Sequence, residues 1–424
     1  MPHRRDLAVA SADLFTGLLR RTHLSRPDQL ADVVAEEAAA ALDAEDVVVS
    51  LVNHEHTALV QVPRRGVPVR EDQPVDGSMA GRSFASTRVL SADAGPDRHG
   101  RPRRRLWVPL LDGTERLGVL ELTVPLGAGE QEVPADEVAV WERYAHLVAM
   151  VTISKSAYSD VVEQVRRSKA MTVGSELIHA VLPPSTYATE GLVLSGMLEP
   201  AYDHGGDAYD YAVNADAVHV AIFDGMGHGL AAAGLTTFAL GTYRAARRSG
   251  ADLRGTYALV NEAVLQQFGG DRHVTAVLAR FEPDSGRLTW ISAGHPPPLL
   301  LRDSQVVKAL RAKPAFPLGW PFPVDPQADL VVAEEVLQPG DAVLLYTDGL
   351  TEARRPHEDM LGVDGLAAFL TQEAAAGQSA PETLRRLRRA VLQRQGGQLR
   401  DDATALLVEW RRGSEQDAVP QTVL

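Results

Sequence analysis

The chain has 424 residues, of which 45% are hydrophobic and 23% charged, and its net charge is −14. This is the composition of a globular protein with two or three domains, and its acidity argues against a nucleic acid or an anionic membrane as partner. The sequence has no cysteine, no long apolar run and no signal-peptide core. It therefore predicts a cytoplasmic protein without disulfides.

The N-terminal third alternates helical and strand patterns. Helices are expected over 7–19 and 29–42, where alanines and acidic residues favour helix formation. Turn residues then separate short apolar runs. The expected elements that follow are two strands within 46–62, a short helix within 76–86, a strand at 89–90, a hairpin of 106–111 and 116–124, and a helix from about 134.

This order of elements resembles that of GAF sensor domains. The run 117–122, Leu-Gly-Val-Leu-Glu-Leu, is similar to one of their core strands. The resemblance covers residues 26–152 and leaves residues 1–25 as a separate N-terminal helix. It implies an α/β sensor that binds a small molecule or dimerises, without indicating which molecule.

A heptad-like stripe follows the sensor region. Seven of its eight positions are Val, Tyr or Leu, with Ser154 the exception: 140, 144, 147, 151, 154, 158, 161 and 165. The stripe predicts a linker helix over 153–180 that continues the preceding helix, about 60 Å long from 138 to 179, and pairs two chains as a homodimer. The alternative is that its first half packs on the sensor sheet and its second half on the C-terminal domain.

Four acidic sites in the C-terminal half lie beside expected strands. Asp207 follows two glycines, Asp224 ends the apolar run 217–223, Asp348 follows the strand 342–346, and an Asp-Asp pair precedes the run 405–408. Taken singly, each is typical of an ordinary turn. Gathered together, such carboxylates repel one another and need divalent cations, and an all-oxygen ligand set favours Mg²⁺ or Mn²⁺ over zinc.

The remaining pattern of the C-terminal half alternates strands with helices. A long helix is expected over 230–248, directly after three glycines that follow Asp224. Further strands are expected at 274–281, 288–292, 299–302 and 330–337, and helices at 361–369 and 381–395.

These motifs resemble those of the PPM-type metal-dependent serine/threonine phosphatases, in particular the bacterial stage II sporulation protein E and sigma-factor regulator branch. The motifs are Gly205-Gly206-Asp207 with Asp210, Asp224-Gly225-Met226-Gly227-His228-Gly229, Ala293-Gly294-His295-Pro296-Pro297, Thr347-Asp348-Gly349 and Asp401-Asp402-Ala403-Thr404. The resemblance covers about 181–410. It implies an α+β protein whose phosphatase domain, 181–412, is an αββα sandwich of two antiparallel sheets, followed by a disordered tail at 413–424.

The resemblance also implies the catalytic set, which is Asp207, Asp224, Asp348 and Asp401. Asp224 would bridge two Mn²⁺ or Mg²⁺ ions, and the Gly225 carbonyl would bind one of them. Asp348 and Asp401 would hold the second ion, and Asp207 would lie beside the first, directly or through water.

Three other residues keep open roles. Asp402 fits a ligand role as well as its neighbour Asp401 does. His228 and His295 could transfer protons, but filling a turn beside the site is the stronger interpretation. No residue is assigned to bind phosphate.

The expected reaction is hydrolysis of a phosphoserine or phosphothreonine ester by a water that bridges the two ions. Because the chain has no cysteine, a thiolate mechanism is excluded. The resemblance implies that the substrate is a phosphorylated anti-anti-sigma factor and that the sensor controls the enzyme. The alternatives are a catalytically silent phosphatase-like binding module and a small-molecule phosphohydrolase.

Overall fold

The computed structural model describes residues 6–127, 129–200, 202–203, 205–321, 330–353, 360–396, 399 and 401–420. The chain divides into two units, Met1–Ser168 with Gln416–Leu424 and Lys169–Glu415. In the described part of the chain, no helix is both long enough and apolar enough to cross a membrane.

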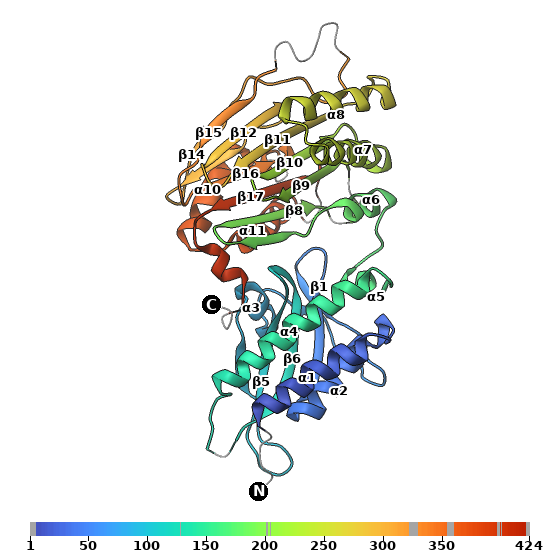
Figure 1. Ribbon diagram of the computed structural model, residues 1–424, viewed down its shortest axis with the longest axis vertical. Coiled ribbons are helices and arrows are strands. Elements are labelled where there is room, and N and C mark those ends of the chain that lie inside the picture. The colour runs from blue at the N-terminus through green and yellow to red at the C-terminus, as the bar shows by residue number, and fades with distance from the viewer. Residues whose placement is uncertain are drawn as a thin grey trace. The chain divides into compact units, whose positions relative to one another are not determined.

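The first unit is one antiparallel sheet with helices on both faces (Figure 1). Its helices are α1 (Leu7–Thr22), η1 (Pro27–Gln29), α2 (Leu30–Leu42), α3 (Met79–Ser86), α4 (Ala135–Ser156) and α5 (Val161–Arg166). Its strands are β1 (Glu45–Val52), β2 (Ala58–Gln61), β3 (Gln73–Pro74), β4 (Leu90–Asp93), β5 (Arg103–Asp112) and β6 (Glu115–Pro125), in the order β3-β2-β1-β6-β5-β4.

Alternation along the strands builds the two cores of this unit. One set of strand side chains packs with α1, α2 and α4, and the opposite set packs with α3 around Phe84 and Trp107. The elements expected from the sequence are present in the expected order. Because α1 packs on α2, the N-terminal helix is part of this unit instead of a separate segment. The identity of the unit as a GAF-like sensor stays a prediction.

The continuous linker helix is a wrong prediction. Helix α4 ends at Ser156 and α5 at Arg166, and the next helix, α6 (Val173–Val181), belongs to the second unit. The Ser159 hydroxyl accepts the backbone N–H of Val161, so short polar side chains compete with helical hydrogen bonding at this point. The first half of the stripe, including Val140 and Tyr144, packs into the first unit's core, as the alternative interpretation held.

The second unit is a sandwich of two antiparallel sheets (Figure 1). One sheet has the order β15-β12-β11-β10-β9 and the other β14-β13-β16-β17-β8-β7. Their strands are β7 (Thr186–Thr189), β8 (Leu192–Glu199), β9 (Asp207–Val213), β10 (Val218–Gly225), β11 (Val274–Glu282), β12 (Arg287–Ala293), β13 (Leu299–Arg302), β14 (Gln305–Ala309), β15 (Ala333–Val336), β16 (Ala342–Tyr346) and β17 (Ala403–Trp410). The predicted α+β sandwich of two antiparallel sheets flanked by helices is confirmed.

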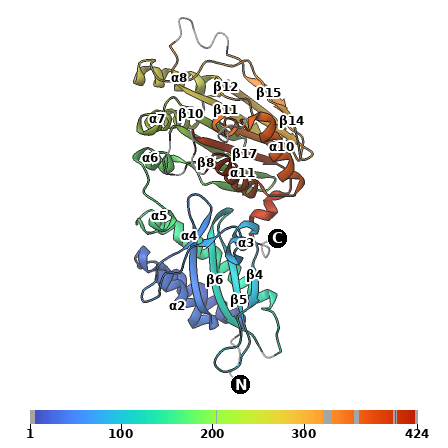
Figure 2. The ribbon, with the colours of Figure 1, turned by 180° about the vertical axis from the view of Figure 1, so that it is seen from behind.

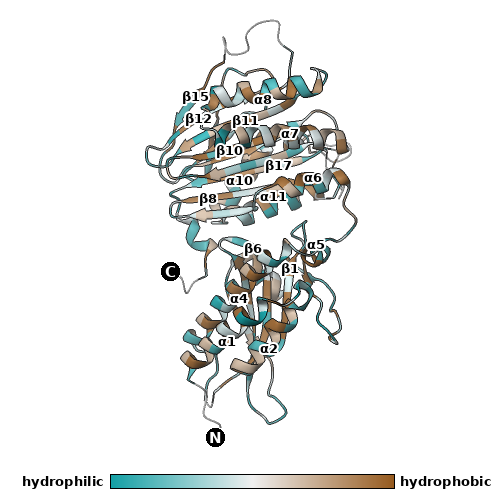
Figure 3. Ribbon diagram, turned by 45° about the vertical axis from the view of Figure 1, so that its right-hand side comes forward, coloured by the Kyte–Doolittle hydropathy of each residue, from teal (hydrophilic) through white to brown (hydrophobic). Residues whose placement is uncertain are grey.

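Helices cover the outer face of each sheet. Helices α6, α7 (Gly229–Arg248) and α8 (Leu253–Phe268) lie on the side of the first sheet, while α10 (Gly362–Ala375) and α11 (Ala380–Arg394) cover the second (Figure 2). Both α7 and α8 carry hydrophobic and hydrophilic residues, as helices with one buried face do (Figure 3). The short helix α9 (Asp348–Thr351) follows β16, and the 3-10 helix η2 (Ser414–Ala418) lies in the tail that was expected to be disordered.

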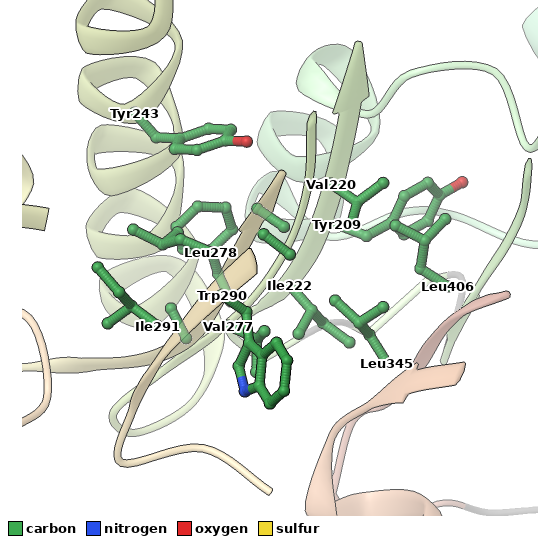
Figure 4. Close-up of a cluster of buried hydrophobic side chains, with 14 of the residues drawn as sticks. Tyr209, Val220, Ile222, Tyr243, Val277, Leu278, Trp290, Ile291, Leu345 and Leu406 are labelled. Atoms are coloured by element: carbon green, nitrogen blue, oxygen red, sulfur yellow. The ribbon is translucent and has the colours of Figure 1, made fainter. Parts of the chain in front are cut away.

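The main core fills the space between the two sheets. Alternate residues of β10 divide between its two faces. Val220 and Ile222 point toward Leu345 and Leu406 of the opposite sheet, whereas Phe223 packs edge-on against Tyr243 of α7 (Figure 4). This alternation fixes which strand-end residues face the inside of the sandwich.

Candidate active site

Two of the predicted acids lie side by side on the first sheet. Asp207 begins β9 and Asp224 is the second-last residue of β10. The two strands are antiparallel and pair Asp207 directly with Asp224, so the start of one and the end of the other meet at one edge of the sheet. Asp207 is 2% exposed, and Asp224 is half-buried.

The other two predicted acids lie at the matching edge of the second sheet. Strand β16 ends at Tyr346, which pairs with Ala405 of β17. The ladder continues for one more step, because the Thr347 N–H donates to the Thr404 carbonyl at 3.0 Å. Asp348 follows immediately, and Asp401 lies two residues before the start of β17 at Ala403.

Hydrogen bonds join the two edges. The Thr347 hydroxyl donates to Asp207 Oδ2 at 2.6 Å and accepts the Thr404 N–H at 2.9 Å. The Asp402 carboxylate accepts N–H groups from Gly205 at 2.9 Å, from Gly206 at 2.6 Å and, more weakly, from Asp207 at 3.3 Å. Residues about 140 to 200 positions apart in the chain are thereby held together.

Position 206 must be a glycine because the backbone of Gly225 packs closely against it. A Cβ on Gly206 would lie 2.5 Å from the Gly225 carbonyl oxygen, well inside van der Waals contact. In turn, the Gly225 N–H donates to the Gly206 carbonyl at 3.1 Å. The paired glycines bring the Gly225 carbonyl close to Gly206, the residue before Asp207, and the predicted role of this carbonyl as a metal ligand stays a prediction.

The carboxylates share one electrostatic environment. Burial, together with the charges of Asp348, Asp401 and Asp402, raises the pKa of Asp224 to about 7. Burial and the charges of Asp224 and Asp402 raise the pKa of Asp207 well above its usual value. Partial desolvation, although the residue is exposed, also raises the pKa of Asp401, with the charges of Asp402 and Asp348 contributing. Acids from both sheets therefore repel one another across this edge.

Asp401 and Asp402 differ in what their side chains do. Asp402 is 6% exposed, and its oxygens are occupied by the N–H groups of the Gly205–Asp207 turn. Asp401 is exposed, and its Oδ1 accepts the Asp402 N–H at 2.9 Å. A cation at this edge could therefore reach the Asp401 carboxylate more readily than that of Asp402.

His295 is a buried link between the sheets. One ring nitrogen, Nδ1, lies 2.8 Å from the Thr275 hydroxyl, and the other, Nε2, lies 3.0 Å from the Tyr346 carbonyl. Thr275 pairs with Asp224, and Tyr346 is two residues before Asp348. Burial lowers the pKa of His295 to about 4, so the ring is neutral and donates Nε2–H to the carbonyl.

The remaining motif residues have simpler surroundings. His228 is exposed and precedes α7 without capping it. Asp210, on the opposite face of β9 from Asp207, forms buried ion pairs with Arg244 at 2.6 Å and Arg247 at 3.1 Å. Asp210 therefore ties β9 to α7 and lies apart from the acidic edge.

The groups at this edge fit a divalent cation that is held partly by water. Only oxygen donors meet at this edge, and among the described residues no lysine or arginine forms an ion pair with Asp224, Asp348 or Asp401. No three described carboxylate or imidazole side chains, however, are close enough to form a preassembled metal cluster. Mg²⁺ and Mn²⁺ retain several waters and accept backbone carbonyls, so the set fits ions held partly by water and by Gly225.

The positioning roles of two residues at this edge were not predicted from the sequence, which placed Thr347 in a motif without a role and gave Asp402 only a possible ligand role. The Thr347 hydroxyl orients Asp207, and the Asp402 carboxylate shapes the turn before it. Both stand next to predicted ligands in the chain, but no sequence pattern distinguishes a ligand from the residue that positions it.

Comparison with known proteins finds a family model and several relatives that match part of the chain. Residues 214–411 match the family model described as stage II sporulation protein E. Phosphoserine phosphatase RsbU of Bacillus subtilis (strain 168) is 24% identical over 220 residues, which are 52% of this chain and 63% of that protein. Protein IcfG of Synechocystis sp. is 23% identical over 306 residues, 63% of this chain and 46% of that protein. The chain thus spans less than two thirds of either relative.

Two solved structures each match about half of the chain. The RsbU and RsbW domains of Rv1364c from Mycobacterium tuberculosis share 26% identity over 52% of this chain and 62% of that one, with a TM-score of 0.44. The SiaA-PP2C domain of Pseudomonas aeruginosa shares 23% identity over 51% of this chain and 85% of that one, also with a TM-score of 0.44.

Proposed function

We propose that this chain, whose C-terminal half is a stage II sporulation protein E-type domain of the PP2C-type serine/threonine phosphatase family, hydrolyses phosphoserine or phosphothreonine in a protein. The observation that carries the proposal is the convergence of four acids at one edge of the sandwich: Asp207, Asp224, Asp348 and Asp401. Among the residues that the structure describes, no lysine or arginine forms an ion pair with Asp224, Asp348 or Asp401. Such an edge attracts divalent cations and, with them, a phosphate ester.

Each residue of this edge has a distinct task in the proposal. The carboxylates of Asp224, Asp348 and Asp401 and the Gly225 carbonyl hold two Mn²⁺ or Mg²⁺ ions, with Asp207 beside the first. When bound, such ions supply positive charge to the phosphoryl oxygens and lower the pKa of water toward neutrality.

The supporting residues keep these oxygens in place. The Thr347 hydroxyl holds Asp207 in one orientation, and His295 bridges the strand beside Asp224 and the strand that leads to Asp348. Asp402 keeps the glycine turn closed through its N–H bonds. Because these contacts are buried, the edge is preorganised before a substrate arrives.

The proposed substrate is a phosphorylated anti-anti-sigma factor in the cytoplasm, with release of a sigma factor as the consequence. Support comes from the similarity to RsbU, which is named a phosphoserine phosphatase. The whole chain's substrate and partners are proposals, since the similarity covers 63% of that protein.

The N-terminal unit is proposed to be the regulatory part, as a GAF-like sensor that takes a small-molecule ligand or mediates a homodimer. Because the helix is broken between α4 and α6, a long coiled coil cannot couple the N-terminal unit to the second unit. Any dimer must therefore use other surfaces, and sedimentation analysis of the full chain tests whether one forms.

The test of the proposed function is manganese-dependent release of phosphate from a phosphoserine protein and from an aryl phosphate. Wild type should turn over both, and Asp224→Asn and Asp348→Asn should each lose at least about 100-fold in activity, or ~2.7 kcal/mol of barrier. Asp216→Asn, on an exposed acid at the far end of the β9–β10 hairpin, is the matched control and should keep full activity.

Two results would replace the proposal. Rapid turnover of free phosphate esters with no preference for phosphoproteins would indicate a small-molecule phosphohydrolase. Absence of turnover with either metal would indicate a catalytically silent module.

A further inference from the structure

Arg272 lies in the loop before β11, opposite the glycine turn that follows Asp224. In the ladder between β10 and β11, Gly225 pairs with Val274. One step further, the Met226 N–H donates to the His273 carbonyl at 3.0 Å. The same antiparallel register brings Arg272 opposite Gly227 at the next step.

The guanidinium of Arg272 lies over this turn. Its Nη1 is 3.7 Å from the position that a Cβ would occupy on Gly227. Gly227 has a φ of +99°, a conformation that residues with a side chain rarely adopt. The Arg272 guanidinium therefore faces the backbone of the turn at this point, and Gly227 has no side chain to cover that backbone. The Arg272 guanidinium, which is exposed, thus lies beside Gly227, a residue that follows Asp224 by three positions and Gly225 by two.

The backbone that carries Arg272 is anchored on its other side as well. Val274 and Leu318 exchange two backbone hydrogen bonds of 2.9 and 2.8 Å. The Gly319 N–H donates to Asn261 Oδ1 at 2.8 Å, and the Arg272 carbonyl packs beside Gly319. The backbone at Arg272 is therefore fixed, and its side chain is exposed.

Arg272 also differs from the arginines that the fold uses for structure. Arg244 and Arg247 bind the buried Asp210, and Arg388 binds the buried Glu199. Among the described residues, no acidic side chain forms an ion pair with Arg272, and its side chain is exposed. No described residue accepts a hydrogen bond from its guanidinium, so within the described part of the chain its N–H donors are available to an incoming anion.

We propose that Arg272 binds the phosphoryl group of the substrate and the phosphate product. The proposal rests on the proposed function, because it supplies the phosphate contact that the motifs left unassigned. The charges of four carboxylates and two divalent cations roughly cancel, so a dianionic ester needs a further cation. A guanidinium supplies that charge and two parallel hydrogen bonds to phosphoryl oxygens.

The test compares Arg272→Gln and Arg272→Lys in the full chain loaded with manganese. Arg272→Gln loses a charge-assisted contact, so its KM for an aryl phosphate and its inhibition constant for inorganic phosphate should each rise about 10-fold or more. Both constants should take intermediate values in Arg272→Lys. Manganese affinity should stay unchanged. Arg248→Gln, on an exposed arginine at the opposite end of α7, is the matched control and should behave as wild type.

Calorimetric binding of inorganic phosphate separates this inference from the proposed function. Weaker phosphate binding by Arg272→Gln than by wild type supports the inference whether or not the chain turns over an ester. Equal binding by the two proteins overturns it, and leaves the assignment of the carboxylate edge intact if turnover is retained.

Discussion

Replacing the adjacent acids one at a time should separate a residue that binds a cation from one that shapes the fold. Asp402→Asn puts an amide NH₂ against backbone N–H donors that now meet a carboxylate at 2.9 and 2.6 Å. Loss of one charge-assisted hydrogen bond costs about 1.5 to 3 kcal/mol. For a domain of this size, that lowers the melting temperature by about 3 to 12 °C.

Asp401→Asn should give the opposite pattern. Because the Asp401 side chain is exposed, its replacement should change stability by no more than about 0.5 kcal/mol. Activity should nevertheless fall at least about 100-fold, or ~2.7 kcal/mol. Manganese at about 100 times its dissociation constant stabilises a protein that binds it by ~2.7 kcal/mol, and Asp401→Asn should lose much of this increment.

Thermal melting of both variants, with and without manganese, measures all of these effects in the full chain. The reasoning is refuted if Asp402→Asn melts as wild type does while Asp401→Asn is strongly destabilised and remains active. That result would exchange the roles of the two residues.

Three further predictions concern buried contacts. The pKa of His295 is about 4 in the folded chain and about 6.5 in the unfolded chain, so its contribution to stability is full above pH 6.5 and falls by about 3 kcal/mol as pH drops to 4. In urea unfolding, the free energy of unfolding should depend less on pH in His295→Gln than in wild type. The exposed control His228→Ala should show the pH dependence of wild type. Thr347→Val should lower kcat about 10-fold by freeing Asp207, and Thr347→Ser should restore it; equal rates in all three proteins would contradict this role. Asp210→Leu leaves two partly buried guanidinium groups without their carboxylate and should lower the free energy of unfolding in urea by about 3 to 5 kcal/mol, and a change below about 1 kcal/mol would contradict the ion-pair argument.

The sequence predicted the acidic edge because strand ends carry a clear local signal. A continuous apolar run before Asp224, and another before Asp348, indicate buried strands, and the acids mark where these strands end. In an antiparallel sandwich, such ends meet at common edges, so convergence followed from the fold that the motifs implied. The strands β13 and β16 were predicted with the bounds that the structure has.

Other parts of the second unit escaped prediction because their signal is not local. Helix α8 and strands β7, β8 and β14 have no motif, and β8 is defined by pairing with β17, more than two hundred residues later in the chain. The direction of the Asp402 side chain likewise depends on N–H groups from a distant turn.

The linker failed for a related reason. A heptad pattern reports that one helix face is buried but does not say against what. Tyr144 packs inside the first unit, whereas Tyr158, a later position of the same stripe, is 83% exposed where the helix has ended. The polar residues between α4 and α5, including Ser159, carried the signal for the break.

Titration of the metal-free chain with manganese tests the central claim most directly, since the claim is that acids from two sheets act together on divalent cations. Wild type should bind two ions, with phosphate-ester hydrolysis appearing as they bind. Asp224→Asn should bind neither ion tightly and should be inactive. Unchanged binding of two ions by Asp224→Asn, or hydrolysis by wild type in the presence of a strong chelator, would contradict the account.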